Sequence, residues 1–411
     1  MQILIETWAL KMLNNPLQFG RLSIPNRVVF QPMEGCDCHE DGTPGELTVK
    51  KYMNAAESGA GLIWLEATAV CPEGRTNPRQ MMLTEANLPA FAELVKNMRR
   101  AAEEKTGTRP AVFIQLTHSG RQSIVPMIAY RHPLYEATRP VTDANIVADE
   151  YLATLPALYA KTAALAVKAG FDGVDVKSCH GYLFQELLSA FNRPGNYGGS
   201  FENRTRLYFD SIRAVKAAVP KDYPVVTRLS VSDVIPYPYG FGTDKDGNLD
   251  LTEPDRLIGM LVNEGIGMLN VTLGNPYYNS FVNRPYRAPA GAPETPDVGL
   301  KRFEDVEKHI KTLFPSLLVV GSGLSFYRAD LMEQAEGQLA RGICDLVGFG
   351  RMTLAYPAFY RDYLAGKFDP KKTCVACSKC TALMRAKCVS GCAVFNEYYR
   401  ELYKEKVACK K

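Results

Sequence analysis

The amino-acid sequence predicts an α/β protein, and specifically a closed (β/α)8 barrel followed by a short cysteine-rich segment. Short apolar runs typical of buried strands alternate with segments of helical periodicity along most of the 411 residues. Such alternation predicts a parallel sheet, and eight strands favour a barrel over the alternative, an open doubly wound sheet. No GxGxxG sequence follows the first strand, which weighs against a dinucleotide-binding sheet of that kind.

The strands and helices of the predicted barrel follow one another in a regular order. The strand candidates are Val28–Gln31, Gly61–Glu66, Ala111–Leu116, Gly173–Val176, Val225–Leu229, Met268–Val271, Leu317–Gly321 and Asp345–Gly348. The helical segments are Leu47–Ser58, Leu88–Glu103, Tyr151–Ala169, Ser200–Val219, Glu253–Glu264, Leu300–Leu313, Tyr327–Arg341 and Pro357–Leu364. A small hairpin is expected at Pro16–Pro25, ahead of the first strand. We therefore predict a barrel over residues 13–366 and a C-terminal extension over residues 367–411.

Three segments between the predicted elements are too long to be plain connectors. They are Thr117–Glu150, Ser230–Thr252 and Gly274–Val298, which follow the third, fifth and sixth strands. On a barrel, loops after strands lie over the C-terminal mouth, where active sites are found. We expect these three loops to shape a substrate pocket.

The composition is that of an ordinary globular protein, with 46% hydrophobic and 22% charged residues. The net charge of +4 is too small to indicate a nucleic-acid partner, and no run of Lys and Arg suggests one. No apolar stretch reaches membrane-spanning length. The N-terminus contains Glu6 and lacks both the basic start and the cleavage site of a secretion signal, so the cytoplasm is the expected location.

The stretch that holds the most reactive side chains begins with the predicted strand Gly173–Val176. Lys177, His180 and Tyr182 follow at the C-terminal end of this strand. Because parallel α/β folds place their chemistry at the C-terminal ends of strands, these residues predict an active site. The alternative is that His180 and Tyr182 are half-buried loop residues without a chemical role.

The cysteines are crowded near the C-terminus, which in a large intracellular chain indicates metal rather than disulfides. Cys374, Cys377 and Cys380 are separated by two residues each, and Cys392 follows after eleven more. A tight thiolate triplet plus one distant ligand suits a [4Fe–4S] cluster. Zinc is the alternative, although zinc sites more often show two separated CxxC pairs. Cys388 competes with Cys392 for the fourth position.

Glycine-rich turns follow the seventh and eighth predicted strands. They are Val320–Gly323 and Gly348–Arg351. Loops at these positions of a barrel commonly bind phosphate through backbone N–H groups and a helix N-terminus. Arg351 adds a bidentate side-chain donor. The two turns together predict a phosphate-bearing cofactor at the mouth of the barrel.

Polar residues also end two other strands. Gln115 ends the third strand and Arg228 the fifth. A buried arginine needs a partner, and Arg and Gln side chains at a barrel mouth suit a flat heteroaromatic ligand that bears carbonyl groups. The alternative is that Arg228 pairs with a buried carboxylate, such as Asp175 or Glu66.

Taken together, these motifs resemble the old yellow enzyme family of flavin oxidoreductases. More narrowly, they resemble its iron–sulfur branch, which includes bacterial 2,4-dienoyl-CoA reductase and trimethylamine dehydrogenase. The resemblance runs from about Pro16 to Val394. It rests on Asn26-Arg27, Pro32-Met33, Gly61–Glu66 with Ala67, Gln115-Leu116, His118, Gly120-Arg121, His180–Leu183, Tyr197–Ser200, Glu202–Arg204, Gly321–Gly323, Gly350-Arg351 and Cys392–Val394. The last of these segments resembles the one that carries the family's fourth cluster ligand, which favours Cys392 over Cys388.

The resemblance implies FMN at the mouth of the barrel, a [4Fe–4S] cluster beside it and NAD(P)H as the electron donor. It assigns contacts with the flavin ring to Pro32, Met33, Ala67, Gln115 and Arg228, and contacts with the phosphate to Gly323, Gly350 and Arg351. Gln115 would bind the pyrimidine edge of the flavin, and Arg228 would lie near its N1 and O2 atoms.

The resemblance also implies a reaction. Hydride would pass from reduced FMN to the β-carbon of an α,β-unsaturated carbonyl compound, such as an enoyl thioester or a cyclic, steroid-like enone. Tyr182 would protonate the α-carbon, because an unperturbed tyrosine pKa of about 10 leaves the phenol protonated at neutral pH. His180 would hydrogen-bond to the substrate carbonyl.

Two residues and the C-terminus depart from the family pattern. Lys177 stands where many relatives have a second histidine, and we expect it to bind the substrate oxygen, to pair with Asp175 or to contact the flavin. Glu34 follows Met33, where many relatives have Thr or Cys. An ionised acid there would disfavour flavin reduction, so we expect Glu34 to be neutral or turned away. The sequence ends at Lys411, without the nucleotide-binding domains of 2,4-dienoyl-CoA reductase.

Three functions follow from these expectations. The first is an FMN- and [4Fe–4S]-dependent ene reductase linked to NAD(P)H. The second is a dehydrogenase of an amine or a saturated substrate, which passes electrons through the cluster to an electron-transfer protein. Such an amine site would need an aromatic cage, for which Tyr277, Tyr278, Tyr286 and Tyr182 are available. The third is an electron-carrying subunit of a larger assembly. The sequence leaves open whether the chain forms a homo-oligomer.

Overall fold

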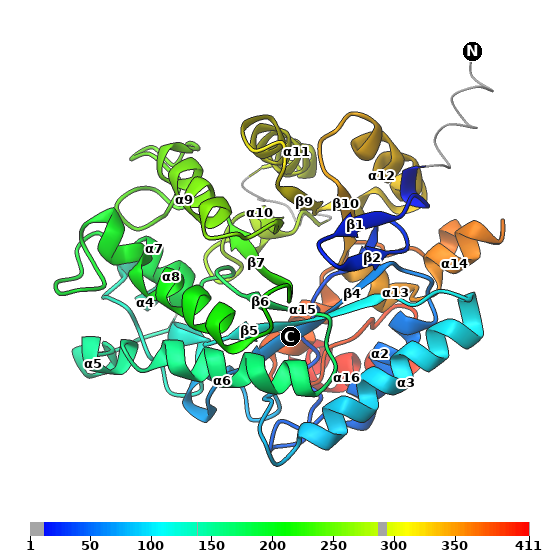
Figure 1. Ribbon diagram of the computed structural model, residues 1–411, viewed down its shortest axis with the longest axis horizontal. Helices are drawn as coiled ribbons and strands as arrows, with labels where there is room; N and C mark the ends of the chain where they lie inside the picture. The colour runs from blue at the N-terminus through cyan, green and yellow to red at the C-terminus, as the bar shows by residue number, and fades with distance from the viewer. Residues whose placement is uncertain (1–11, 138, 287–293, 411) are drawn as a thin grey trace.

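The fold is a closed barrel of parallel strands surrounded by helices. The computed structural model describes residues 12–137, 139–286 and 294–410. Eight strands close in the order β10-β3-β4-β5-β6-β7-β8-β9, and every neighbouring pair is parallel. Figure 1 shows the helices arranged around these strands. The predicted (β/α)8 barrel is therefore confirmed.

The strands lie close to their predicted positions because each apolar run is buried on both faces, as a barrel covered by helices requires. Their bounds are β3 (Val28–Phe30), β4 (Leu62–Ala69), β5 (Ala111–Thr117), β6 (Gly173–Val176), β7 (Val225–Ser230), β8 (Met268–Thr272), β9 (Leu318–Gly321) and β10 (Leu346–Phe349).

The expected hairpin at the N-terminus is present and closes one end of the barrel. Strands β1 (Leu17–Phe19) and β2 (Leu22–Ile24) pair in antiparallel fashion. Their apolar side chains pack against Trp64, Phe113 and Met268, inside the end of the barrel where the strands begin. The opposite end, where the strands finish, is therefore the one available for a functional site.

Helices follow the strands as the sequence predicts. The longer ones are α2 (Glu46–Ala56), α3 (Leu88–Thr106), α6 (Leu155–Lys168), α8 (Phe201–Ala218), α9 (Thr252–Asn263), α11 (Pro296–Leu313), α12 (Leu331–Ala340) and α16 (Glu397–Lys406). The shorter ones are α4 (Pro133–Glu136), α5 (Asp149–Leu152), α7 (Leu183–Leu188), α10 (Ser280–Asn283), α13 (Arg351–Ala355), α14 (Phe359–Leu364) and α15 (Lys379–Arg385).

Two predicted helices differ from the observed ones. The segment predicted as one helix over Tyr151–Ala169 is divided between α5 and α6. Pro156 lies in the first turn of α6, where no helical hydrogen bond needs its missing N–H. Inside one continuous helix the proline would remove such a bond. The helix predicted from Tyr327 begins at Leu331, because Arg328 has a φ of 57°, which lies in the left-handed region and interrupts the helix.

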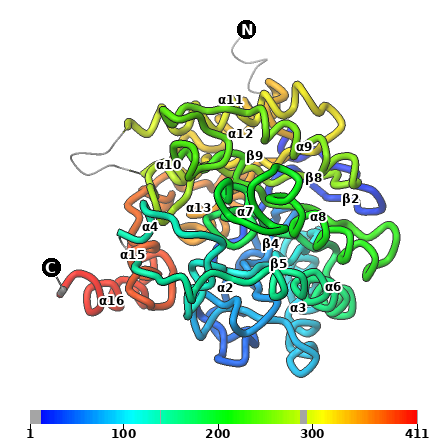
Figure 2. Tube along the Cα trace, turned by 90° about the vertical axis from the view of Figure 1, so that its left-hand side faces the viewer, coloured from blue at the N-terminus to red at the C-terminus, as the bar shows by residue number. Residues whose placement is uncertain are grey.

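The cysteine-rich C-terminal segment lies over the mouth of the barrel. The backbone N–H of Ser390 donates to the carbonyl of Gly35, after β3, at 2.7 Å. Arg385 donates to the carbonyl of Pro276, after β8, at 3.0 Å. Figure 2 shows the chain from α15 to α16 at one side of the barrel. The domain boundary at residues 366 and 367 stays a prediction. Within the described ranges, no helix has both the length and the apolar character needed to span a membrane.

Candidate active site

A sharp turn after β6 places the predicted reactive side chains in the mouth. The backbone φ angles of His180 and Gly181 are 64° and 69°, both in the left-handed region. A Cβ atom on Gly181 would lie 2.3 Å from Nδ2 of Asn275, so this position requires glycine. The turn leads directly into α7, with Tyr182 as its N-cap residue. The local sequence thus fixes the direction in which Tyr182 enters the site.

Lys177 and Tyr182 lie against each other in the interior. Nζ of Lys177 is 3.8 Å from the centre of the Tyr182 ring, which is a cation–π contact. The two residues are only 4% and 2% exposed. Burial lowers the pKa of Lys177. In the part of the chain that the structure describes, no ion pair joins Lys177 to Asp175. The expected pairing of these two residues is therefore not observed.

The Tyr182 hydroxyl faces a carboxylate. It donates a hydrogen bond to Oε2 of Glu34 at 3.0 Å. Burial raises the pKa of Tyr182 well above its ordinary value, and the charge of Glu34 and the neighbouring Tyr277 raise it further. The phenol is therefore protonated at neutral pH, as a proton donor must be.

His180 is neutral in a pocket of positive charge. Burial lowers the pKa of His180 well below its ordinary value, and the charges of Arg228, Lys177 and Arg284 lower it further. A neutral imidazole retains one N–H donor. The imidazole of His180 and the positive charges around it favour a ligand on which negative charge develops at an oxygen atom.

Asp175 supports the site from inside the barrel. Its Oδ2 atom accepts hydrogen bonds from Trp64 Nε1 at 3.0 Å and from Gln115 Nε2 at 2.6 Å. Its Oδ1 atom accepts one from the backbone N–H of Arg228 at 2.8 Å. Burial raises the pKa of Asp175 to about 6. These bonds fix the Gln115 side chain and the end of β7 relative to one another.

The Arg228 side chain has an unused donor. Its Nε atom is buried and has no hydrogen-bond partner among the described residues. A buried N–H without an acceptor costs free energy unless a ligand supplies one. Within the same residues, neither Asp175 nor Glu66 forms an ion pair with this guanidinium, so the predicted alternative for Arg228 is not observed. Arg228 and Gln115 fit the polar edge of a flavin ring.

A bulge in β4 fixes the loop that carries Pro32, Met33 and Glu34. The register with β5 shifts between Leu65 and Ala67, which leaves Glu66 outside the regular pairing. The backbone N–H of Gly35 donates to Glu66 Oε2 at 2.6 Å, and Lys51 forms an ion pair with Glu66. Burial raises the pKa of Glu66 to about 7.

The two predicted phosphate turns lie side by side. β9 and β10, which precede Gly323 and Gly350, are hydrogen-bonded neighbours. Gly323 has a φ of 88°. A Cβ atom on Gly350 would lie 3.0 Å from Sδ of Met33, so this turn passes close to the loop after β3. Paired glycine turns at these positions are of the kind that binds phosphate through backbone N–H groups, although the N–H of Ser322 in the first turn already donates to Glu307 Oε1 at 2.8 Å. That they hold the phosphate of FMN stays a prediction.

The predicted cluster ligands line one small pocket, and Cys388 is not among its lining residues. In the described chain, no three His, Cys, Asp or Glu side chains are close enough to hold a single metal ion. Four thiolates that line one pocket fit the donor set of a [4Fe–4S] cluster, and they also suit the alternative, zinc. Which metal they bind stays a prediction. The lining cysteines are Cys374, Cys377, Cys380 and Cys392.

Arg351 lies between the phosphate turns and the cysteines. It follows Gly350 directly and also lines the cysteine pocket. Its Nη2 atom donates to the carbonyl of Pro285 at 2.7 Å. Its Nη1 atom is buried and has no partner within the residues that the structure covers. A bond from Arg351 to the FMN phosphate stays a prediction.

Three residues near Tyr182 or His180 were missed or placed differently by the sequence. Glu34, for which the sequence predicted a neutral or turned-away acid, accepts a hydrogen bond from Tyr182 that the sequence did not predict. Tyr277 was considered only for an aromatic cage, and it neighbours the Tyr182 hydroxyl. Arg284 was not predicted, and its Nε atom is buried without a partner among the described residues. The one available signal was the position of Glu34 directly after Met33.

Comparison with known proteins identifies related sequences. The model of the NADH:flavin oxidoreductase / NADH oxidase family matches residues 12–243. The chain is 27% identical to an NADH oxidase of Thermoanaerobacter brockii over 369 residues, which cover 88% of this chain and 52% of the relative. It is 26% identical to a cinnamate reductase of Clostridium sporogenes over 403 residues, which cover 93% of this chain and 57% of the relative. The chain thus spans about half the length of these curated relatives.

Comparison with solved structures identifies the same fold. The complex of 2-naphthoyl-CoA reductase with 2-naphthoyl-CoA gives a TM-score of 0.77 at 19% identity, covering 96% of this chain and 58% of that one. Histamine dehydrogenase from Rhizobium sp. 4-9 gives a TM-score of 0.74 at 20% identity, covering 96% of this chain and 53% of that one. At these identities the likeness concerns the fold.

Proposed function

Because this chain belongs to the NADH:flavin oxidoreductase / NADH oxidase family, we propose that it is an FMN-dependent ene reductase that uses NAD(P)H to reduce α,β-unsaturated carbonyl compounds. The observation that carries the proposal is the buried, protonated Tyr182 beside Lys177 and His180. FMN, when bound and reduced by NAD(P)H, supplies a hydride to the β-carbon of the alkene. The match to a cinnamate reductase supports an alkene conjugated to a carboxyl or carbonyl group as the substrate.

The side chains of the turn after β6 have distinct roles in this reaction. Tyr182 gives its phenolic proton to the α-carbon of the substrate. The neutral imidazole of His180 donates a hydrogen bond to the carbonyl oxygen and so withdraws electrons from the alkene. Lys177 adds positive charge where the oxygen becomes negative, and it holds the ring of Tyr182 in place. Arg228 and Gln115 bind the polar edge of the flavin.

The cysteine pocket has a separate role in the proposal. Cys374, Cys377, Cys380 and Cys392 bind a [4Fe–4S] cluster, which exchanges electrons with the flavin or stabilises the C-terminal segment. Arg351 contributes positive charge between the cluster thiolates and the phosphate turns. An electron-transfer protein would be a second source of electrons besides NAD(P)H, since the cysteine pocket shares Arg351 with the second phosphate turn.

Oxidation of an amine is the alternative function. The proximity of Tyr277 to Tyr182 favours it, since aromatic side chains can surround an ammonium group. Lys177, Arg228 and Arg284 weigh against it, because all three place positive charge near His180. A cationic substrate is repelled in such a pocket, whereas an enolate oxygen is stabilised. The charges therefore support the ene reductase.

Product analysis under anaerobic conditions tests the proposed function. The purified holoenzyme is incubated with NADH or NADPH and with a cyclic enone, an enoyl thioester or cinnamate. We expect one or more of these compounds to gain two hydrogens in proportion to the NAD(P)H oxidised. The saturated analogues and simple amines serve as controls. Oxidation of NAD(P)H without a saturated product from any alkene contradicts the proposal.

A further inference from the structure

We propose that Glu34 is the proton relay that resupplies Tyr182 in each turnover, an inference that rests on the proposed ene reductase function. Glu34 Oε2 lies 3.0 Å from the Tyr182 hydroxyl oxygen. Its other oxygen, Oε1, accepts a hydrogen bond from the Thr76 hydroxyl at 3.3 Å. Asn77 Nδ2 donates to Thr76 Oγ1 at 2.9 Å. Glu34, Thr76 and Asn77 are half-buried, so a continuous series of contacts joins the buried phenol to a more accessible side of the site.

The environment of Tyr182 makes such a relay necessary. Each reduction takes the phenolic proton, and the residue is only 2% exposed, so bulk water does not reach the oxygen freely. Burial raises the pKa of Tyr182 well above its ordinary value. A tyrosinate beside an ionised Glu34 would place two negative charges about 3 Å apart in a buried site, which is strongly unfavourable. The phenol must therefore recover a proton promptly, and Glu34 is the carboxyl group in contact with it.

The proton transfers balance over one turnover. The alkene takes a hydride at the β-carbon and the phenolic proton of Tyr182 at the α-carbon. Water delivers a proton to the Glu34 carboxylate from the side of Thr76, and the carboxyl group passes a proton on to the Tyr182 oxygen. NAD(P)H is oxidised, the alkene is reduced, and both side chains end as they began.

Glu34 is a better proton source than the other neighbour of Tyr182. Tyr277 also neighbours the Tyr182 hydroxyl and is 38% exposed. The Glu34 carboxylate can take up a proton at one oxygen and pass one on from the other, whereas the Tyr277 phenol would supply a proton only by becoming an anion beside Glu34. The titratable groups that interact with Glu34 are Tyr182, Tyr277, Lys177, Cys36 and Cys179, of which only Lys177 forms a cation.

The backbone directly after Glu34 is held in place by two hydrogen bonds of Gly35. The N–H of Gly35 donates to Glu66 Oε2 at 2.6 Å, and the carbonyl of Gly35 accepts from Ser390 at 2.7 Å. A relay needs its carboxyl group at a fixed distance from the phenol, and anchors of this kind provide it. The position directly after Met33 is thus built to present an acid to Tyr182.

Glu34→Gln removes the carboxylate that can take up and pass on a proton but keeps the size of the side chain. The two half-reactions of the holoenzyme are measured separately by anaerobic stopped flow. We expect reduction of the flavin by NAD(P)H to be unchanged and its reoxidation by the alkene to slow by about 100-fold. Glu34→Asp, which retains an acid, is expected to recover part of the rate. Added acetate is expected to accelerate Glu34→Ala but not Glu34→Gln.

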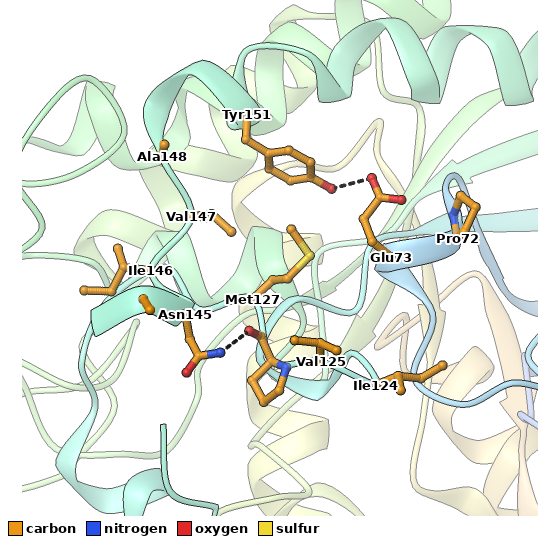
Figure 3. A pocket seen from close by; sticks show the side chains of 12 residues that line it. Pro72, Glu73, Ile124, Val125, Met127, Asn145, Ile146, Val147, Ala148 and Tyr151 are labelled. Atoms are coloured by element: carbon orange, nitrogen blue, oxygen red, sulfur yellow. Dashed lines mark hydrogen bonds between the residues drawn. The ribbon is translucent and has the colours of Figure 1, made fainter. Parts of the chain in front are cut away.

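The chain offers a matched control outside this contact. Tyr151 donates to Glu73 Oε1 at 2.9 Å, beside a separate pocket lined by Met127 and Val147, and Figure 3 shows the two side chains facing each other. Glu73→Gln removes the same charge from the same kind of pair, and we expect its reoxidation rate to match the wild type. A second readout is the infrared difference spectrum between oxidised and reduced protein. A carboxyl band that is lost in Glu34→Gln and kept in Glu73→Gln supports the relay.

The outcomes separate the relay from the proposed function. If the wild type is reoxidised by an alkene and Glu34→Gln reacts at the same rate, the relay is overturned and the ene reductase stands. If Tyr277→Phe slows reoxidation by the alkene and Glu34→Gln does not, the proton enters through Tyr277. The relay is then also overturned. If no alkene reoxidises the wild type, the proposed function and the relay fall together.

Discussion

Tyr182→Phe is expected to slow the reoxidation of reduced flavin by an alkene by about 100- to 10,000-fold, which is the range for loss of a general acid. The substitution removes the phenolic proton, whereas the ring that packs against Lys177 remains. Reduction of the flavin by NAD(P)H is expected to proceed at the wild-type rate, because no proton from Tyr182 is needed in that step. Anaerobic stopped-flow spectroscopy measures both rates on the same preparation.

Tyr223→Phe is the control for this substitution. Tyr223 is also buried, and its hydroxyl donates to the carbonyl of Phe171 at 2.9 Å. It precedes β7, at the end of the barrel opposite the mouth. We expect this variant to lose about 1 kcal/mol of unfolding free energy and to keep both half-reactions. Equal effects of the two substitutions on reoxidation would show that Tyr182 is not the proton donor.

Cys392→Ser is expected to abolish or severely reduce cluster binding, because one of four thiolate ligands is lost. Iron and acid-labile sulfide per chain, together with the broad visible absorption of the cluster, measure the effect. Cys388→Ser is the matched comparison, since Cys388 lies four residues away and outside the pocket of the other cysteines. We expect it to keep its iron. Loss of iron from Cys388→Ser, with retention in Cys392→Ser, would reverse the ligand assignment.

The barrel could be predicted from the sequence because its determinants are local. Each strand is a short apolar run, and each helix shows its own periodicity, so the alternation is visible without knowledge of contacts. The two errors in the helices have different causes. Pro156 divides one predicted helix, and the left-handed backbone at Arg328 delays another. The first could have been foreseen from the proline, whereas the second depends on how the loop after β9 packs.

The site was less predictable because its contacts join distant loops. That Lys177, His180 and Tyr182 share one turn follows from the sequence, but the partner of Tyr182 does not. Glu34 is 148 residues away in the chain, and its orientation depends on the bulge at Glu66, which anchors the loop after β3. Sequence patterns describe neighbours along the chain, so a contact of this kind appears only once the barrel has closed.

Arg228 shows the same limit in a different way. A buried arginine was expected to find either a carboxylate or a ligand, and the sequence offered no means to choose. The structure directs Asp175 to Trp64 and Gln115, which leaves Arg228 Nε without a partner among the described residues. Arg228 thus keeps a buried donor that a ligand can use.

The most direct measurement of the central claim is an anaerobic spectral titration of the purified holoenzyme. NADH or NADPH is added until the absorption of oxidised flavin is bleached, and enones, enoyl thioesters and amines are then added in turn. An ene reductase predicts that an unsaturated carbonyl compound restores the oxidised spectrum, and that amines do not bleach the flavin in the absence of NAD(P)H. Bleaching by an amine without NAD(P)H, with no recovery on addition of any unsaturated carbonyl compound, would contradict the account.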